Sequence, residues 1–260
     1  MKTNLLNLAH TSLRKFSIAA AVLGMLSAAT TRAAVVFDNM SIFEAGNTNS
    51  HVTSTGSTPN TFMGDGYVLA AGTTAITGFD LYPVNLSGTS YTGLKLNIYV
   101  WGTVNTGTVN ATTPAFGNLL GSYTFTETGS FTTGFYFPLE SGTPGTPGIA
   151  LSTPLAISST TIGVSLNFQG TTDGVNYASI NSLTSLIQYG TAPTVGSQMF
   201  NGYYRNANSE VDGNFTSTLR SLGQTNQSLG LRIYGTSVPE PTTLALLGAG
   251  GVLLFLRRRA

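Results

Sequence analysis

The sequence predicts an all-β protein, an antiparallel β-sandwich of jelly-roll type. Three observations predict this class. Ser and Thr make up 65 of the 260 residues, and charged residues only 8%, against about 25% in ordinary globular proteins. In the central region, apolar residues alternate with polar ones in short runs, which Gly, Pro, Asn or Ser interrupt. Hydroxyl side chains suit turns and solvent-facing strand positions, and the alternation places one face of a strand in a core.

The first 33 residues have the features of a signal peptide. Met1–Lys15 contains three basic residues and no acidic one, and Phe16–Ala29 carries no charge at all. A basic region followed by an apolar run of this length is typical of a secretory signal and is too short for an ordinary membrane span. Small residues at Thr31 and Ala33 predict cleavage after Ala33, with cleavage after Ala29 as the alternative.

The clearest strand is predicted at Leu94–Trp101, where Leu, Leu, Ile and Val share one face and Lys, Asn, Tyr and Trp share the other. The same alternation predicts strands at Thr74–Leu81, Gly121–Thr128, Phe131–Pro138, Thr160–Phe168 and Leu229–Tyr234. No segment of ten or more residues outside the two ends has a convincing helical period.

Turns and loops are predicted where Gly, Pro and Asn gather. Glu127–Ser130 is expected to be a hairpin turn in which Gly129 supplies a positive φ. Long loops are expected at Asn47–Asn60, Thr103–Pro114 and Ser141–Pro154. We expect one domain at residues 34–236, closed by pairing between a strand at Val35–Phe37 and the strand at Leu229–Tyr234.

The last residues, 237–260, have three parts in a fixed order. Val238 precedes Pro239-Glu240-Pro241, then Thr242–Leu256 runs without a charge, and Arg257, Arg258 and Arg259 follow. Fifteen residues span about 22 Å as a helix, less than the roughly 30 Å of a hydrocarbon core, so a short transmembrane helix would need its flanks to snorkel. The three arginines predict a stop-transfer signal that stays cytoplasmic.

These three parts resemble the PEP-CTERM sorting domain of Gram-negative bacterial surface proteins. The resemblance covers only residues 236–260. It implies that an exosortase recognises Pro239, Glu240 and Pro241 and removes the helix, and that the inner membrane holds the chain only transiently. It further implies release to the cell surface or to the extracellular polymeric substance. Without the resemblance, the same segment would be a plain membrane anchor with a stiff linker.

Charge excludes one class of partner. Residues 34–236 contain four basic and nine acidic residues, a net charge of −5. A sparsely charged, mildly acidic surface offers no basic stripe for phosphates, which argues against nucleic acid. The chain has no Cys, so disulfides, thiol nucleophiles and Cys-ligated metals are excluded.

The sequence favours a protein that is not an enzyme. A Ser/His/Asp triad in residues 34–236 would have to use His51, and no Gly-x-Ser-x-Gly elbow accompanies it. A matrix glycosidase remains an alternative, since it needs only a pair of carboxylates across a cleft. The candidates for that pair are Glu127, Glu140, Glu210 and Asp212.

A second alternative is a carbohydrate-binding module that recognises surface or matrix polysaccharide. Tyr99 and Trp101 lie on the polar face of the clearest strand, and Tyr203 and Tyr204 precede an Asn-rich segment. Exposed rings can stack on sugar faces. The competing interpretation is that these rings pack in the core, because a central strand often buries both faces.

One segment has the spacing of a calcium loop. Asn206, Asn208, Glu210 and Asp212 place oxygen-bearing side chains at every second position before Gly213. The segment lacks the distal bidentate Glu of an EF-hand, so a hairpin turn at Asp212-Gly213 is the favoured interpretation. No cofactor is expected apart from this candidate structural calcium. The whole sequence predicts an exported, non-enzymatic surface or matrix protein with a structural or adhesive role.

Overall fold

The computed structural model describes residues 33–40, 50–52, 62–86, 88–106, 114–133, 138–179, 183–188, 190, 192–206, 218–220 and 225–237. The chain divides into two compact units, Met1–Arg32 and Ala33–Ala260, and every described residue belongs to the second unit. The predicted signal peptide, sorting segment and C-terminal helix therefore lie outside the described residues, apart from Ala33 and Ser237. Within the described part, no helix is long and apolar enough to cross a membrane.

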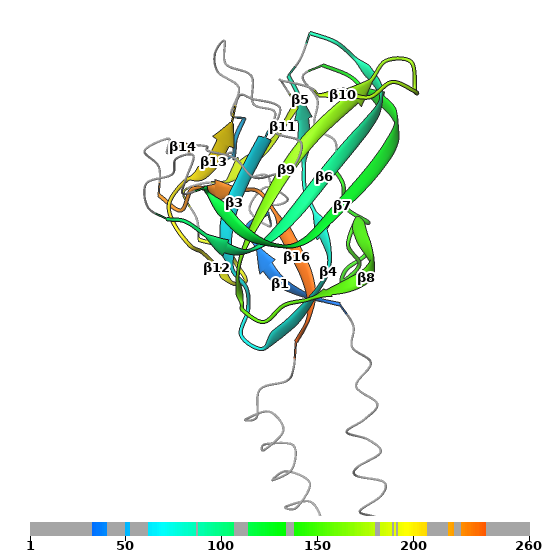
Figure 1. Cartoon of the computed structure of the whole chain (residues 1–260). Coiled ribbons are helices and arrows are strands. Elements are labelled where there is room, and N and C mark those ends of the chain that lie inside the picture. Colours follow the sequence, from blue (N-terminus) through cyan, green and yellow to red (C-terminus); the bar gives the residue numbers. More distant parts are fainter. Residues whose placement is uncertain are drawn as a thin grey trace, which may run out of the picture. The chain divides into compact units, whose positions relative to one another are not determined.

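The described residues form strands and no helix, in two larger antiparallel sheets and a third sheet of four short strands (Figure 1). The larger of the two sheets with four strands is called the four-stranded sheet. The four-stranded sheet has the order β1-β16-β4-β8, with strands Ala34–Asp38, Arg232–Ser237, Thr73–Asp80 and Ile149–Ala156. The eight-stranded sheet has the order β14-β13-β3-β9-β6-β7, with strands Thr218–Arg220, Tyr203–Asn206, Phe62–Val68, Thr161–Thr171, Tyr91–Val104 and Phe116–Phe131. The short strands β10 (Ala178–Ser179) and β12 (Ser197–Gln198) add to β9 and β3.

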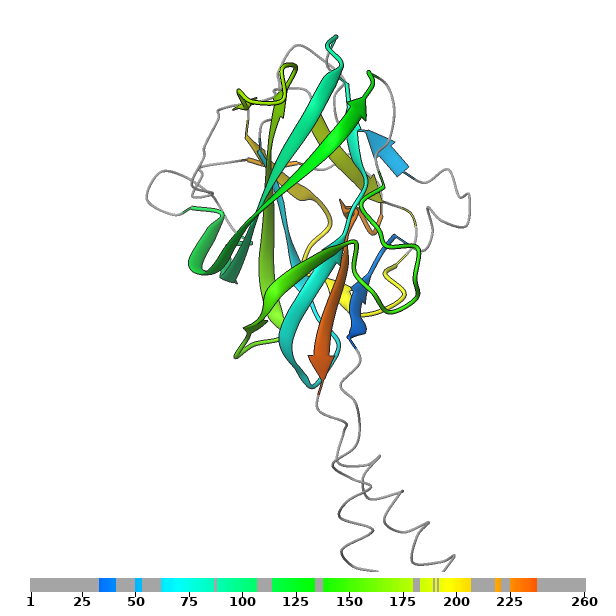
Figure 2. The ribbon, with the colours of Figure 1, turned by 90° about the vertical axis from the view of Figure 1, so that its right-hand side faces the viewer.

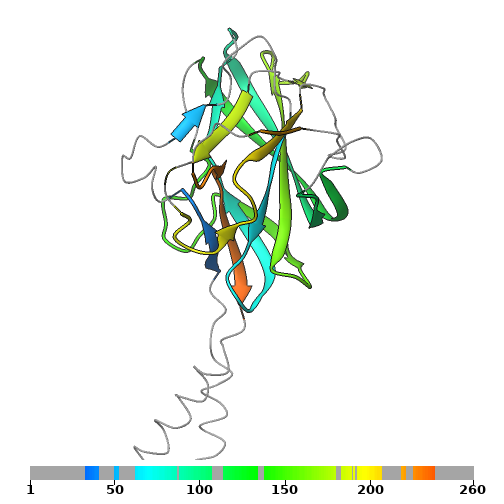
Figure 3. The ribbon, with the colours of Figure 1, turned by 90° about the vertical axis from the view of Figure 1, so that its left-hand side faces the viewer.

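The third sheet has the order β15-β11-β2, with β5 also paired to β11. Its strands are Ser228–Leu229, Leu183–Gln188, Ser50–Val52 and, for β5, Pro83–Asn85. Figure 3 shows β2 and β11 toward the end of the domain away from the tip of β16.

A single apolar core lies between the two larger sheets. The eight-stranded sheet contributes alternate residues of β6 and β9, namely Leu94, Leu96, Ile98 and Val100, and Ile162, Val164, Leu166 and Phe168. The four-stranded sheet contributes Phe37, Ile76, Phe79, Ile149 and Ile233 to the same core. Figure 2 shows the two layers crossing at an angle. The predicted all-β class and antiparallel sheets are confirmed, and the period of two in the sequence identifies the inner face of β6 correctly.

The predicted pairing of the two terminal strands is also confirmed. β1 pairs with β16, with Val35 opposite Tyr234 and Asp38 opposite Arg232. Because β4 pairs with the other side of β16, the last strand of the domain is hydrogen-bonded along both edges.

The predicted hairpin at Glu127–Ser130 is wrong. β7 runs through this segment without a turn, and Glu127 lies opposite Leu94 on β6. The pairing moves two residues along β6, from Gly93 to Tyr91, while it moves three along β7, from Thr128 to Phe131, so Gly129 lies in a β-bulge. The long partner strand β6 supplies backbone hydrogen bonds along the whole of β7, which a turn would forfeit. Phe131 therefore ends a strand rather than beginning one.

The predicted loop at Ser141–Pro154 is only half right. Residues 141–148 have no regular structure, whereas β8 begins at Ile149 and pairs with β4. Pro154 is tolerated because β8 is an edge strand whose pairing with β4 is interrupted between Ala150 and Leu155. Of the other two loops, the one expected at Thr103–Pro114 starts later because β6 extends to Val104. The one at Asn47–Asn60 contains the short strand β2, and all of its other residues lie outside the described part.

Candidate binding site

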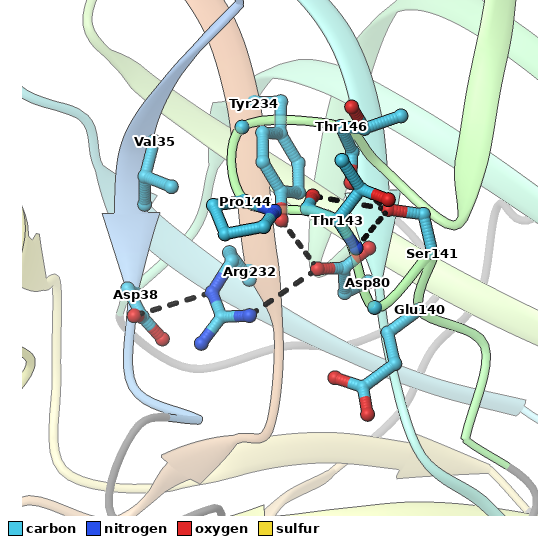
Figure 4. Close-up of a pocket in the computed structure, with 12 residues that line it drawn as sticks. Val35, Asp38, Asp80, Glu140, Ser141, Thr143, Pro144, Thr146, Arg232 and Tyr234 are labelled. Atoms are coloured by element: carbon cyan, nitrogen blue, oxygen red, sulfur yellow. Dashed lines mark hydrogen bonds and ion pairs between the residues drawn. The ribbon is translucent and has the colours of Figure 1, made fainter.

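A pocket of about 410 Å³ lies on the outer face of the four-stranded sheet (Figure 4). Its floor is formed by side chains of β1, β16 and the end of β4, and its wall by residues 140–146. Arg232 and Tyr234 face the pocket because Ile233, the residue between them on β16, faces the core.

The floor is a row of charged side chains across three neighbouring strands. Arg232 lies directly opposite Asp38 on β1 and opposite Asp80 on β4. Its Nε atom is 3.2 Å from Asp38 Oδ2, and its Nη1 atom is 3.3 Å from Asp80 Oδ2. Tyr234 donates its hydroxyl hydrogen to Asp80 Oδ2 at 2.6 Å. The guanidinium thus compensates two carboxylates that the fold removes from water.

Backbone groups complete this network. Gly148 N–H donates to Asp80 Oδ1 at 2.6 Å, and Met40 N–H donates to Asp38 Oδ1 at 2.8 Å. Both oxygens of Asp80 therefore accept hydrogen bonds. Burial raises the pKa of Tyr234, and the hydrogen bond to Asp80 and the charge of that carboxylate raise it further. Tyr234 consequently stays a neutral donor at physiological pH.

The wall is a loop that holds its own shape. Ser141 Oγ donates to the carbonyl of Thr146 at 2.7 Å and accepts from the N–H of Thr143 at 3.1 Å. Gly145 has a φ of 77°, a region that L-residues rarely adopt. At the base of the loop, a Cβ on Gly148 would lie 2.5 Å from backbone atoms of Leu139 and Glu140. Only glycine therefore allows this close approach, and the pocket is preformed.

The sequence predicted one residue of this pocket, Glu140, as a candidate carboxylate. It did not predict the pairing of Asp38, Asp80 and Arg232. The available signal was weak: Arg232 is one of only four basic residues in residues 34–236, and it interrupts an otherwise apolar strand.

The four aromatic residues that the carbohydrate-binding alternative places on an exposed face are buried. Tyr99, Trp101, Tyr203 and Tyr204 are 7%, 4%, 1% and 0% exposed. Tyr203 packs in the core between the sheets, while the other three form a second cluster with Phe116. The competing interpretation in the sequence, that these rings pack inside the protein, is the correct one.

Packing on the outer face of the eight-stranded sheet explains this burial. Trp101 donates from Nε1 to Ser165 Oγ at 2.8 Å and stacks on Phe116, with ring centroids 6.0 Å apart. Phe116 fits because Gly64 and Gly163 leave room, and a Cβ on either glycine would come within 2.7 Å of the ring. The hydroxyl of Tyr204 donates to the carbonyl of Asn105. Segments far apart in the sequence therefore cover this face.

Beside the aromatic cluster, amide and hydroxyl side chains form a row across β9, β6 and β7. Asn97 lies opposite Asn167 and Thr124. Asn97 Nδ2 donates to Asn167 Oδ1 at 3.2 Å, and Thr124 Oγ1 donates to Asn97 Oδ1 at 2.7 Å. Because these groups satisfy one another, the row stabilises the sheet.

Asp65 is a buried carboxylate in the interior. It accepts hydrogen bonds from Ser228 Oγ at 2.8 Å, from Leu229 N–H at 2.7 Å and from Gly66 N–H at 2.7 Å. Burial raises the pKa of Asp65 to about 8, although these three donors oppose the rise. Asp65 joins β3 to the short strand β15 that precedes β16.

Several predicted site residues lie outside the described part of the chain. They are Asn208, Glu210 and Asp212 of the calcium loop, the sorting residues Val238, Pro239, Glu240 and Pro241, and Arg257, Arg258 and Arg259. Asn206 ends β13. Among the described residues, no group of three or more His, Cys, Asp or Glu side chains is placed to hold a metal ion.

A comparison with known protein families matches residues 237–259 to the PEP-CTERM protein-sorting motif. The match confirms the resemblance carried by Pro239, Glu240, Pro241 and the arginine cluster. The chain is therefore an exported protein whose precursor is sorted by an exosortase. Comparisons with curated proteins and with solved structures found no match.

Proposed function

We propose that the domain at residues 34–236 is a non-enzymatic structural or adhesive component of the cell surface or the extracellular polymeric substance. The observation that carries the proposal is the sorting motif at residues 237–259, which begins at the last residue of β16. An exported chain delivered in this way acts outside the cell, where a compact β domain can serve as a surface element.

The described carboxylates support a role without catalysis. Asp80 is engaged at both oxygens, and Asp38 is paired with Arg232. A glycosidase needs one carboxyl group to donate a proton and a second to act as base or nucleophile. Carboxylates compensated by a guanidinium and held by backbone N–H groups are poorly suited to exchange protons.

The strand order supports the finer fold assignment of a jelly roll. Eight strands, taken in chain order, are β1, β3, β4, β6, β7, β8, β9 and β16. One sheet has the order β1-β16-β4-β8, which are the first, eighth, third and sixth of these strands. The other has the order β3-β9-β6-β7, which are the second, seventh, fourth and fifth. This distribution is the connectivity of two Greek keys wrapped into a double sheet.

The test compares cells that lack the chain with cells that produce it, and a third strain carries Ala at Pro239, Glu240 and Pro241. We expect deletion to lower surface adhesion and retained matrix. The alanine variant should stay in the inner membrane with its C-terminal segment attached, and should behave like the deletion. Fractionation, immunoblotting and a crystal-violet adhesion assay measure these outcomes.

The matched control replaces the neighbouring Thr242 and Thr243 with Ala, which leaves the Pro-Glu-Pro motif intact. This control should be processed normally. Adhesion and matrix that are unchanged by deletion would refute the structural or adhesive role. Normal release of the Pro-Glu-Pro variant would refute the role of these three residues in sorting.

A further inference from the structure

The pocket on the outer face of the four-stranded sheet is lined by none of the residues 237–259 that match the sorting motif. The loop that walls it is fixed at its base by the hydrogen bond from Gly148 to Asp80 and by the bridge between Leu81 and Leu139. Within the loop, Ser141 bonds to Thr143 and Thr146. A preformed pocket of about 410 Å³ falls in the range of small-ligand sites, roughly 300–1,000 Å³.

The charges around the pocket exclude anionic ligands. Its lining contains three carboxylates, Asp38, Asp80 and Glu140, and one guanidinium, Arg232. The formal charge of this lining is negative, so a phosphate, a sulfate or a uronate would be repelled.

The arrangement of the same groups also disfavours a metal ion. Arg232 lies between Asp38 and Asp80, at 3.2 and 3.3 Å from their oxygens. A cation placed between these carboxylates would face the guanidinium charge. A neutral polar ligand needs neither of these charges and can bind through hydrogen bonds to the rim.

The rim offers the groups that a sugar ring needs. Thr143 and Thr146 bring hydroxyl groups that donate and accept, and the exposed carboxylate of Glu140 accepts hydrogen bonds. Val35 and Pro144 add apolar surface to the lining, and Figure 4 shows Val35 on the side of the pocket away from Glu140. A pyranose has hydroxyl groups at its edge and C–H groups on its faces, which matches this mixture.

We propose that this pocket binds a neutral saccharide unit of the surrounding polymer. Glu140 and the hydroxyls of Thr143 and Thr146 hydrogen-bond to sugar hydroxyls, and Pro144 packs against the C–H face. The row of Asp38, Arg232 and Asp80 fixes the floor. The inference rests on the proposed function, because the matrix is the source of the saccharide.

This site differs from the aromatic strip that the sequence predicted. It lies on the other sheet and uses a polar floor instead of Tyr99 and Trp101, which are buried on the eight-stranded sheet. Aromatic residues that could stack on a sugar are visible in a sequence, whereas a row of charges across three strands depends on the strand order and is not.

The test uses the full-length chain purified in detergent and an array of oligosaccharides. The neutral probes are cellohexaose, chitohexaose and mannohexaose, and the anionic probe is a hexameric uronate. We expect at least one neutral probe to bind with a Kd between about 1 µM and 1 mM in isothermal titration calorimetry, and the uronate to bind at least about tenfold more weakly. Calcium chloride and inorganic phosphate are titrated separately.

Two variants change the pocket, and two matched variants change the exposed part of β7. Thr143→Tyr fills the cavity and should weaken binding at least about tenfold, and Glu140→Gln should weaken it about three- to tenfold. Thr128→Tyr and Glu127→Gln make the same changes on β7, outside this pocket, and should bind like the unmodified chain. Thermal unfolding checks that all four variants fold.

Three results would overturn the inference: no neutral probe binds, phosphate or the uronate binds more tightly than every neutral probe, or Thr143→Tyr and Glu140→Gln bind like their controls. The proposed function fails separately. Loss of adhesion on deletion, combined with normal adhesion by a Thr143→Tyr strain, would leave the adhesive role standing and refute the pocket as its basis.

Discussion

Asp65 and Asp80 are buried to the same degree, with 0% and 1% of their surfaces exposed. Their surroundings differ in one respect. Asp80 has a guanidinium 3.3 Å away, together with a tyrosine hydroxyl and a backbone N–H. Among the described residues, the donors to Asp65 are neutral, namely one serine hydroxyl and two backbone N–H groups.

At Asp65, hydrogen bonds from neutral donors are too weak to keep the buried carboxylate at its ordinary pKa. Three good donors do not offset the loss of water at Asp65, so its pKa rises to about 8. The charge of Asp65 also raises the pKa of Tyr67, whose main shift comes from burial. Around Asp80, the opposite charge of Arg232 compensates the carboxylate directly.

Removing the guanidinium that compensates Asp38 and Asp80 should destabilise the protein more than any other change considered below. Arg232→Met leaves Asp38 and Asp80 without their cation, and we expect it to lower the free energy of unfolding by about 3–5 kcal/mol. Urea denaturation at pH 7 measures the change. Adding Asp38→Asn and Asp80→Asn to the variant should recover part of the loss, because no uncompensated charge then remains. A loss below about 1 kcal/mol for Arg232→Met would show that the row does not depend on charge compensation.

The second prediction is that Asp65 makes the free energy of unfolding depend on pH. Its folded-state pKa of about 8 lies above the ordinary value near 3.9. Between these values the folded protein holds more protons than the unfolded chain, so the contribution is complete below about pH 4 and is lost as the pH rises through 8. We expect stability to fall by up to about 1.4 kcal/mol for each pH unit in this window.

The variant Asp65→Asn should remove this slope in urea denaturation between pH 5 and 8. Asp173→Asn is the control. Asp173 is exposed, and hydrogen bonds from Thr171, Asn176 and Val175 lower its pKa. Its contribution is therefore lost only in acid, and the control should follow the unmodified protein over this range. Equal slopes for Asp65→Asn and the unmodified protein would contradict the raised pKa of Asp65.

The contrast between these two carboxylates also marks the limit of what the sequence predicts. Alternation over Leu94–Trp101 indicated which residues of β6 face the core, because the two faces of a strand follow from a local period. The pairing of Val35–Phe37 with the last strand was predictable from their terminal positions. Nothing local indicated that Asp80 would meet Arg232, since 152 residues separate them. That contact depends on the order of strands in the sheet.

The errors have a related cause. Gly129 was assigned to a turn because glycine permits a positive φ, but it also permits a bulge, and the long partner strand β6 decided between them. The alternative of an open aromatic face depended on Tyr99 and Trp101, which alternate with apolar residues, and it stood beside the interpretation that these rings pack in the core. Ser165, Phe116 and Tyr204 come from distant segments and close that face. Local patterns give the direction of a side chain, whereas burial depends on what the rest of the chain places over it.

A third carboxylate, Glu140, should contribute least to stability. It tests whether burial, rather than a place in the pocket, determines what a carboxylate contributes. Glu140 lines the same pocket as Asp80 but is exposed to solvent. Water screens its charge, so Glu140→Gln should change the free energy of unfolding by no more than about 0.5 kcal/mol at pH 7. Urea denaturation beside Glu127→Gln measures this difference, and the two variants should be alike. A loss above about 1 kcal/mol would mean that the row of Asp38, Arg232 and Asp80 extends into the loop. Glu140 would then support the fold of the pocket as well as line it.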